Sequence, residues 1–121
     1  MDLMTYLRGD LVRLMKRREK VGLRAVRDAI SAIQNAETSY LVSPAKVGSL
    51  SEFVAGAVTF GQAERVVRPL TGEEMMTLAR AEVTRRLEDA ATFREHGQVD
   101  RALMLKAEAL VLSDRLDAFT G

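Results

Sequence analysis

The chain of 121 residues has no cysteine, and this one absence excludes three kinds of chemistry. Without cysteine there is no disulfide, no thiolate nucleophile and no cysteine-based metal site. Aromatic residues are also scarce, with two tyrosines, four phenylalanines and no tryptophan. The core must therefore be built mainly from leucine, valine, isoleucine, alanine and methionine, in a single domain of modest size.

Long hydrophobic runs are absent as well. No stretch of the sequence approaches the roughly 20 apolar residues that a membrane span requires. The first residues of the chain carry charged side chains where a signal peptide has its apolar run. We therefore expect a cytoplasmic protein that is not embedded in a membrane.

Apolar residues recur at spacings of three and four in four segments, which predicts four helices. Their expected ranges are residues 3–17, 21–40, 73–95 and 99–119. A polar run over residues 16–20 leads into Gly22, and this pattern predicts a short turn between the first two helices. His96-Gly97 should end the third helix, because glycine commonly follows a helix C-terminus. Short links between amphipathic helices predict an all-α, antiparallel helical domain of two αα-hairpins.

The same spacing predicts which side of each helix is buried. In the first helix, Asp10 is expected on the polar side. The predicted apolar positions are Met4, Leu7, Leu11, Leu14 and Met15 in the first helix, Leu23, Val26, Ile30 and Ile33 in the second, Met76, Ala79, Val83, Leu87 and Ala90 or Ala91 in the third, and Leu105, Ala109, Leu112, Leu116 and Phe119 in the fourth.

The middle of the chain, over about residues 41–70, is different in composition. It contains both prolines and three glycines, and no helical period survives there. Two short β-prone runs, at residues 57–60 and 65–67, favour either a small hairpin or a loop. We expect an irregular insertion between the second and third helices, with residues 43–68 peripheral to the helical core. Just after it, Thr71 and Glu74 have the spacing of a capping box.

Several motifs of the helical segments occur in a recognisable order. The first half contains Leu7-Arg8-Gly9-Asp10-Leu11, Met15-Lys16, Leu23-Arg24 and Ser31-Ala32-Ile33-Gln34-Asn35-Ala36-Glu37. The second half contains Glu82-Val83, Arg85-Arg86, Phe93, Gly97, Asp100, Glu108 and Leu112. Taken together, this series resembles the YqeY-like (GatB/YqeY) family.

The resemblance implies an all-helical fold and a relation to a C-terminal region of the B subunit of the glutamine-dependent tRNA amidotransferase. That enzyme is a carbon-nitrogen ligase with glutamine as amido-N-donor, and it converts misacylated Glu-tRNA or Asp-tRNA. The resemblance therefore implies tRNA or an amidotransferase-type protein as partner, without implying an activity for stand-alone members. Members of the family normally continue past the fourth helix into a smaller helical tail. We expect this chain to correspond to the N-terminal helical domain alone.

Catalytic machinery is not apparent in the sequence. It has no glycine-rich phosphate loop, nucleophile elbow or metal-ligand spacing, so no catalytic residue, metal site or cofactor is predicted. His96, the only histidine, is expected to cap a helix end or face solvent. Three carboxylates could converge between the helices, namely Glu37, Glu82 and Glu108. We expect them to form ion pairs, with Arg24, Arg27, Arg85 or Arg86 as partners, and Glu82 and Arg86 have the i,i+4 spacing of such a pair.

Basic residues are concentrated near the predicted turn between the first two helices. Eight Lys and Arg against five Asp and Glu give residues 1–40 a net charge of +3, whereas residues 73–121 have a net charge of −3. Such a concentration favours phosphates, although no aromatic residue is interleaved for base stacking. The alternative is a solvated face partly paired with the acidic second half. The candidate nucleic-acid-binding residues are Arg13, Lys16, Arg17, Arg18, Lys20, Arg24 and Arg27.

Two functions remain open from the sequence. The first is a YqeY-like accessory or binding module that acts around tRNA-dependent amidation. The second is a structural or protein-interaction module with no nucleic-acid role. The ligand, the partner and the oligomeric state are not specified by any motif.

Overall fold

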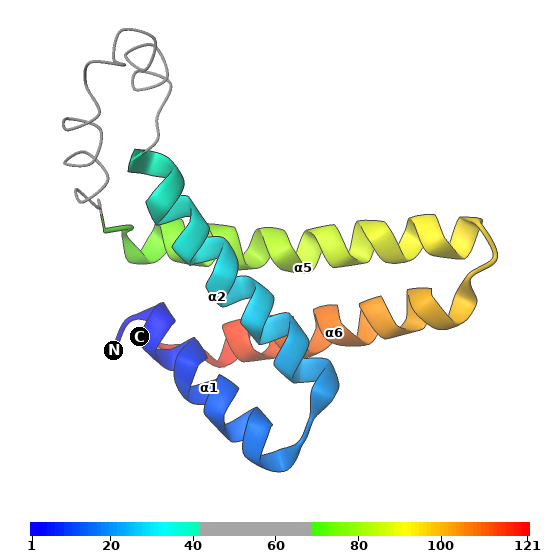
Figure 1. Cartoon of the computed structure of the whole chain (residues 1–121), viewed down its shortest axis with the longest axis horizontal. Helices are drawn as coiled ribbons and strands as arrows, with labels where there is room; N and C mark the ends of the chain where they lie inside the picture. The colour runs from blue at the N-terminus through cyan, green and yellow to red at the C-terminus, as the bar shows by residue number, and fades with distance from the viewer. Residues whose placement is uncertain (42–68) are drawn as a thin grey trace, which may run out of the picture. The chain divides into compact units, whose positions relative to one another are not determined.

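The computed structural model describes residues 1–41 and 69–121 (Figure 1). The chain divides into two compact units, residues 1–33 together with 71–121, and residues 34–70. The predicted insertion and its two β-prone runs lie almost wholly outside the described residues. The account below therefore concerns the first unit, except where the second is named.

Four α-helices and no strand occur in residues 1–41 and 69–121. They are α1 (Leu3–Arg17), α2 (Lys20–Leu41), α5 (Gly72–Glu95) and α6 (Val99–Ala118). A two-residue link joins α1 to α2, and a three-residue link joins the antiparallel helices α5 and α6 (Figure 1). The predicted all-α fold of two αα-hairpins is confirmed. Within these same ranges, no helix has both the length and the apolar character needed to cross a membrane.

Local hydrogen bonds explain where α1 and α5 begin, and a glycine follows the end of α5. Asp2 caps α1 by accepting a 2.8 Å hydrogen bond from the backbone N–H of Thr5, and this bond lowers the pKa of the Asp2 carboxyl. The predicted capping box of α5 is present, because Thr71 and Glu74 each accept a hydrogen bond from the other's backbone N–H. Gly97 follows α5 with a φ of +78°, a conformation that glycine adopts without strain.

The predicted short turn between the first two helices is present within the polar run. It lies at Arg18 and Glu19, where Arg18 adopts a left-handed conformation with a φ of 57°. Gly22 is inside α2 and buried, and a Cβ added to it would lie 2.9 Å from Cγ1 of Val111 and 3.3 Å from both Cδ atoms of Leu14. This glycine therefore allows α2 to approach α1 and α6 closely.

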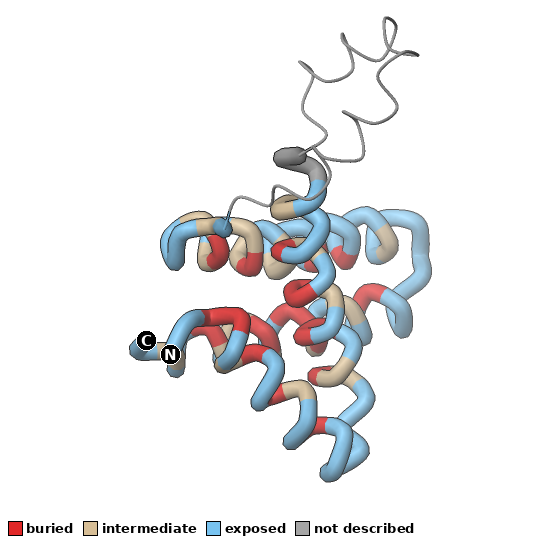
Figure 2. The backbone as a smooth tube through the Cα atoms, turned by 60° about the vertical axis from the view of Figure 1, so that its left-hand side comes forward, coloured by how far each residue is buried: buried red, intermediate tan, exposed pale blue. Residues whose placement is uncertain are grey.

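The core consists of aliphatic side chains and alanines on the facing sides of the helices (Figure 2). The structure buries most of the predicted positions in α1, α2 and α6, including Leu7, Ile33 and Leu112. The buried apolar residues are Leu3, Met4, Leu7 and Leu14 in α1, Ala25, Val26, Ala29, Ile30 and Ile33 in α2, Met75, Ala79 and Ala90 in α5, and Ala102, Ala109, Leu112 and Leu116 in α6.

The predicted faces of two helices, α1 and α5, need correction. Met15 in α1 and Leu87 in α5 are exposed, whereas Asp10 and Arg86 are buried. In α5, Met75 rather than Met76 lies in the core. Ala79 and Ala90 are buried as predicted, so the buried side of α5 is rotated by less than one residue, or less than roughly 100°, from the predicted one.

The two ends of the chain are held together by aromatic residues. The hydroxyl of Tyr6 in α1 donates a 2.8 Å hydrogen bond to the backbone carbonyl of Arg115 in α6. The rings of Tyr6 and Phe119 are 5.0 Å apart, a normal spacing for a favourable aromatic pair. The N- and C-termini consequently lie side by side (Figure 1).

Candidate functional site

The seven basic residues predicted as a nucleic-acid contact lie in one stretch of the chain, which we call the basic turn. It consists of Arg13, Lys16, Arg17, Arg18, Lys20, Arg24 and Arg27, and it spans the end of α1, the link and the first two turns of α2. The link stays short because Arg18 caps α1, its backbone N–H bonding to the carbonyls of Leu14 and Met15. Lys16 and Arg17 lie in the last turn of α1, where cations suit the helix dipole.

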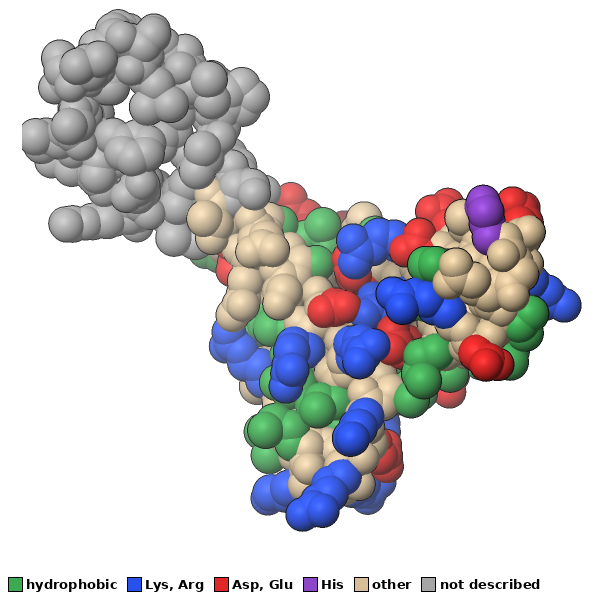
Figure 3. Space-filling view, turned by 45° about the vertical axis from the view of Figure 1, so that its right-hand side comes forward, with side chains coloured by type: hydrophobic (Ala, Val, Ile, Leu, Met, Phe, Trp, Pro, Cys, Tyr) green, Lys and Arg blue, Asp and Glu red, His purple; other side chains and the backbone are tan. Residues whose placement is uncertain are grey.

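All seven side chains of the basic turn are exposed. Figure 3 shows Lys and Arg side chains gathered over the α1–α2 turn at the bottom of the view. Three of the seven have carboxylate partners: Arg13 pairs with Asp10, Arg17 with Glu19 at 4.0 Å, and Arg24 with Glu108 at 3.6 Å. The other four, which are Lys16, Arg18, Lys20 and Arg27, pair with no carboxylate among the residues that the structure describes. The basic turn therefore keeps most of its positive charge available.

Asp10 limits what Arg13 can contribute to this surface. The carboxylate of Asp10 in α1 is buried. It lies next to Arg13, and its Oδ2 is 4.0 Å from Nε of Arg115 in α6. Neither oxygen accepts a hydrogen bond of good geometry from the described part of the chain. A buried carboxylate needs a nearby cation, so Arg13 acts first as the counter-charge of Asp10. The sequence did not indicate this role, since Asp10 was expected on the polar face.

A second cluster of charges lies where α2, α5 and α6 meet. Arg86 in α5 is only 4% exposed, and its guanidinium contacts three carboxylates. Its Nε donates to Glu108 at 3.0 Å, one Nη donates to Glu82 at 3.2 Å, and the other donates to Asp28 in α2. Glu108 also faces Arg24, so this Arg86 cluster links all three helices.

The Arg86 cluster has the properties of a structural network. Burial alone would lower the pKa of the Arg86 guanidinium, but its hydrogen bonds to Asp28 and Glu108 outweigh burial and raise that pKa above the ordinary value. Each carboxylate of the cluster is occupied by a guanidinium, which leaves no carboxyl pair arranged for acid–base chemistry.

The ion pairs expected between the three glutamates and the arginines are confirmed in part. Glu108 bridges to Arg24 and Arg86 on two other helices, whereas Glu82 pairs within α5, with Arg85 at 2.8 Å and with Arg86. Glu37 belongs to the unit of residues 34–70, so its position relative to the cluster is not described.

His96 lies at the C-terminal end of α5. The histidine is exposed at the C-cap of α5, and its Nδ1 lies 2.8 Å from the carbonyl oxygen of Thr92, in the helix-end position expected for it. Across residues 1–41 and 69–121, no group of three or more His, Asp and Glu side chains is arranged to hold a metal ion. Among the described features, the basic turn is therefore the candidate site.

Comparison with known proteins adds no family to these observations. No protein-family model, no curated protein and no solved structure matches the chain. The resemblance to the YqeY-like family consequently stays a prediction that rests on the sequence motifs.

Proposed function

We propose that this chain is a YqeY-like accessory module, without catalytic activity of its own, that binds RNA phosphates through the basic turn. The proposed RNA is tRNA, and the proposed setting is tRNA-dependent amidation in the cytoplasm beside an amidotransferase-type protein. The observation that carries the proposal is the exposure of seven cations on the end of α1, the link and the start of α2. Four of them pair with no carboxylate of residues 1–41 and 69–121.

Electrostatics determines what kind of RNA binding this surface supports. Lysine and arginine side chains that neutralise phosphates release condensed counterions, which favours binding at low salt. Sequence-tolerant binding of single strands usually adds aromatic side chains on which bases stack. No aromatic residue lies between Arg13 and Arg27. The basic turn should therefore contact the RNA backbone with little preference among bases.

Filter binding to unfractionated tRNA at low salt tests the proposal. The charge-reversal variant R17E/R18E/K20E should lose tRNA binding while its helical circular dichroism stays unchanged, because all three side chains are exposed. The matched control is R94E/R101E/K106E. It makes the same change in net charge, but on α5 and α6 near the link that joins them. The control should retain most of the binding. Equal binding by wild type and R17E/R18E/K20E would contradict the proposal.

A protein-interaction module is the second candidate function. It is favoured by a separate observation: a groove lined mainly by apolar side chains lies between α5 and α6.

A further inference from the structure

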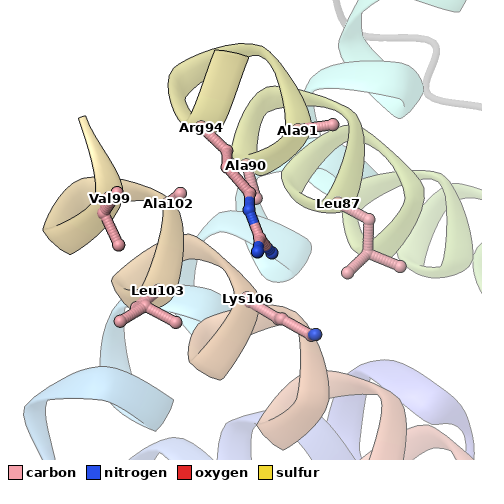
Figure 4. A pocket seen from close by; sticks show the side chains of 8 residues that line it. All are labelled: Leu87, Ala90, Ala91, Arg94, Val99, Ala102, Leu103 and Lys106. Carbon is pink, nitrogen blue, oxygen red and sulfur yellow. The ribbon is translucent and has the colours of Figure 1, made fainter. Parts of the chain in front are cut away.

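A groove lies between α5 and α6 close to the link that joins them (Figure 4). Its volume is about 300 Å³, at the lower end of the range for binding pockets. Three alanines bring little bulk to the lining, so the space between the two helices is not filled there. The lining residues are Leu87, Ala90, Ala91, Arg94, Val99, Ala102, Leu103 and Lys106.

Three large apolar side chains around the groove are exposed. Leu87 is 43% exposed, Val99 is 51% exposed and Leu103 is 58% exposed. Single exposed aliphatic residues are normal on a protein surface, but these three surround one hollow. A ligand that filled the groove would remove all three from water at once.

The charged residues of the groove have one sign. Arg94 extends from α5 into the space between the helices, and Lys106 lies on α6 opposite (Figure 4). No carboxylate lines the groove, and no carboxylate within the described ranges pairs with either cation. A second copy docked face to face would place like charges together, which is unfavourable. The charge of the groove instead complements an acidic partner.

We propose that this groove docks an acidic amphipathic helix of a protein partner. The two lining segments, residues 87–94 and 99–106, each run along the groove for about 10 Å, or two helical turns. Apolar side chains at one face of such a helix would enter the groove, and glutamate or aspartate beside them would meet Arg94 and Lys106. This inference does not rest on RNA binding, because the groove and the basic turn share no residue.

Two synthetic peptides of about 16 residues test the charge of the partner. Both have leucine at the i, i+3, i+4 and i+7 positions, but one has glutamate beside the leucines and the other has lysine. Fluorescence anisotropy of the labelled peptides should show that the wild-type chain prefers the glutamate peptide by about 10-fold or more. The variant R94E/K106E should reverse the preference. The control R101E removes a neighbouring exposed cation that does not line the groove, and it should keep the wild-type preference.

A second variant tests the groove itself. Ala91→Trp puts bulk into the groove from an exposed position, so it should weaken binding of the glutamate peptide by about 10-fold with unchanged helical content. Absence of binding by the wild-type chain, equal binding of the two peptides, or full binding by A91W would each overturn the proposal. A wild-type dimer in sedimentation equilibrium that L103E dissociates would also overturn it, because the occupant would then be a second copy.

Discussion

Arg86 illustrates how a charged residue can occupy a core position. A guanidinium is costly to bury unless its N–H groups find acceptors, and this one reaches carboxylates on α2, α5 and α6. Two of the three, Glu82 and Glu108, are themselves largely removed from solvent. The groups are therefore interdependent: removing one leaves another buried without its partner.

Replacing Arg86 with alanine should destabilise the fold by about 3–5 kcal/mol, because Glu108 then remains buried and has only the more distant Arg24 beside it. Replacing both members of the pair with apolar residues, as in R86M/E108L, should cost less than R86A alone, since neither charge is then left buried. Urea unfolding followed by circular dichroism measures both. A loss below about 1 kcal/mol for R86A, or a larger loss for the double variant, would contradict this reading of the cluster.

At the scale of single helices, two glycines in similar settings have opposite roles. Gly9 lies inside α1, and a Cβ added to it would point into open space. Gly22 lies inside α2 against Val111 and Leu14. Glycine in a helix interior costs about 1 kcal/mol relative to alanine, so only Gly22 has a packing reason to be there.

Gly9→Ala should therefore stabilise the chain by about 0.5–1 kcal/mol. Gly22→Ala should destabilise it, because the new methyl group meets a β-branched side chain and a fully buried leucine, and overpacking costs about 1–3 kcal/mol. Thermal unfolding of the two variants beside wild type is the measurement. The interpretation of Gly22 fails if both substitutions raise the melting temperature.

Helix bounds followed well from the sequence, because apolar periodicity and capping residues are local signals. Residues 3–17 were predicted as a helix and are α1, and the Thr71–Glu74 capping box starts α5 as expected. The rotation of α5 did not follow, since Met75 and Met76 fit the apolar pattern equally well. Choosing between them requires knowing that Arg86 has carboxylate partners on other helices, which is tertiary information.

The two candidate surfaces differ in how far they could be predicted. The exposure of the seven basic side chains followed from the sequence, because charged side chains are exposed by default and their density is visible in the sequence. The groove was not predicted: Leu87 was assigned to the core and Leu103 to no face. A groove depends on which apolar side chains fail to find a partner, and sequence periodicity does not report that.

At the scale of the whole molecule, charge is divided between the helical hairpins. The excess of positive charge in residues 1–40 lies mostly in the basic turn, whereas residues 73–121 are acidic overall. Part of that acidity is offset by Arg24 of α2, which lies 3.6 Å from Glu108. Within the described part of the chain, three of the seven cations of the basic turn form ion pairs, so a field that attracts phosphates remains.

The salt dependence of RNA binding tests the central claim most directly. If about five cations of the basic turn neutralise phosphates of a flexible RNA strand, a plot of log affinity against log salt should have a slope of roughly −3.5. The neutral variant R17Q/R18Q/K20Q should reduce the slope to roughly −1.4, whereas R94Q/R101Q/K106Q should leave it near the wild-type value. A wild-type slope near zero, or the same slope for R17Q/R18Q/K20Q as for wild type, would contradict the account.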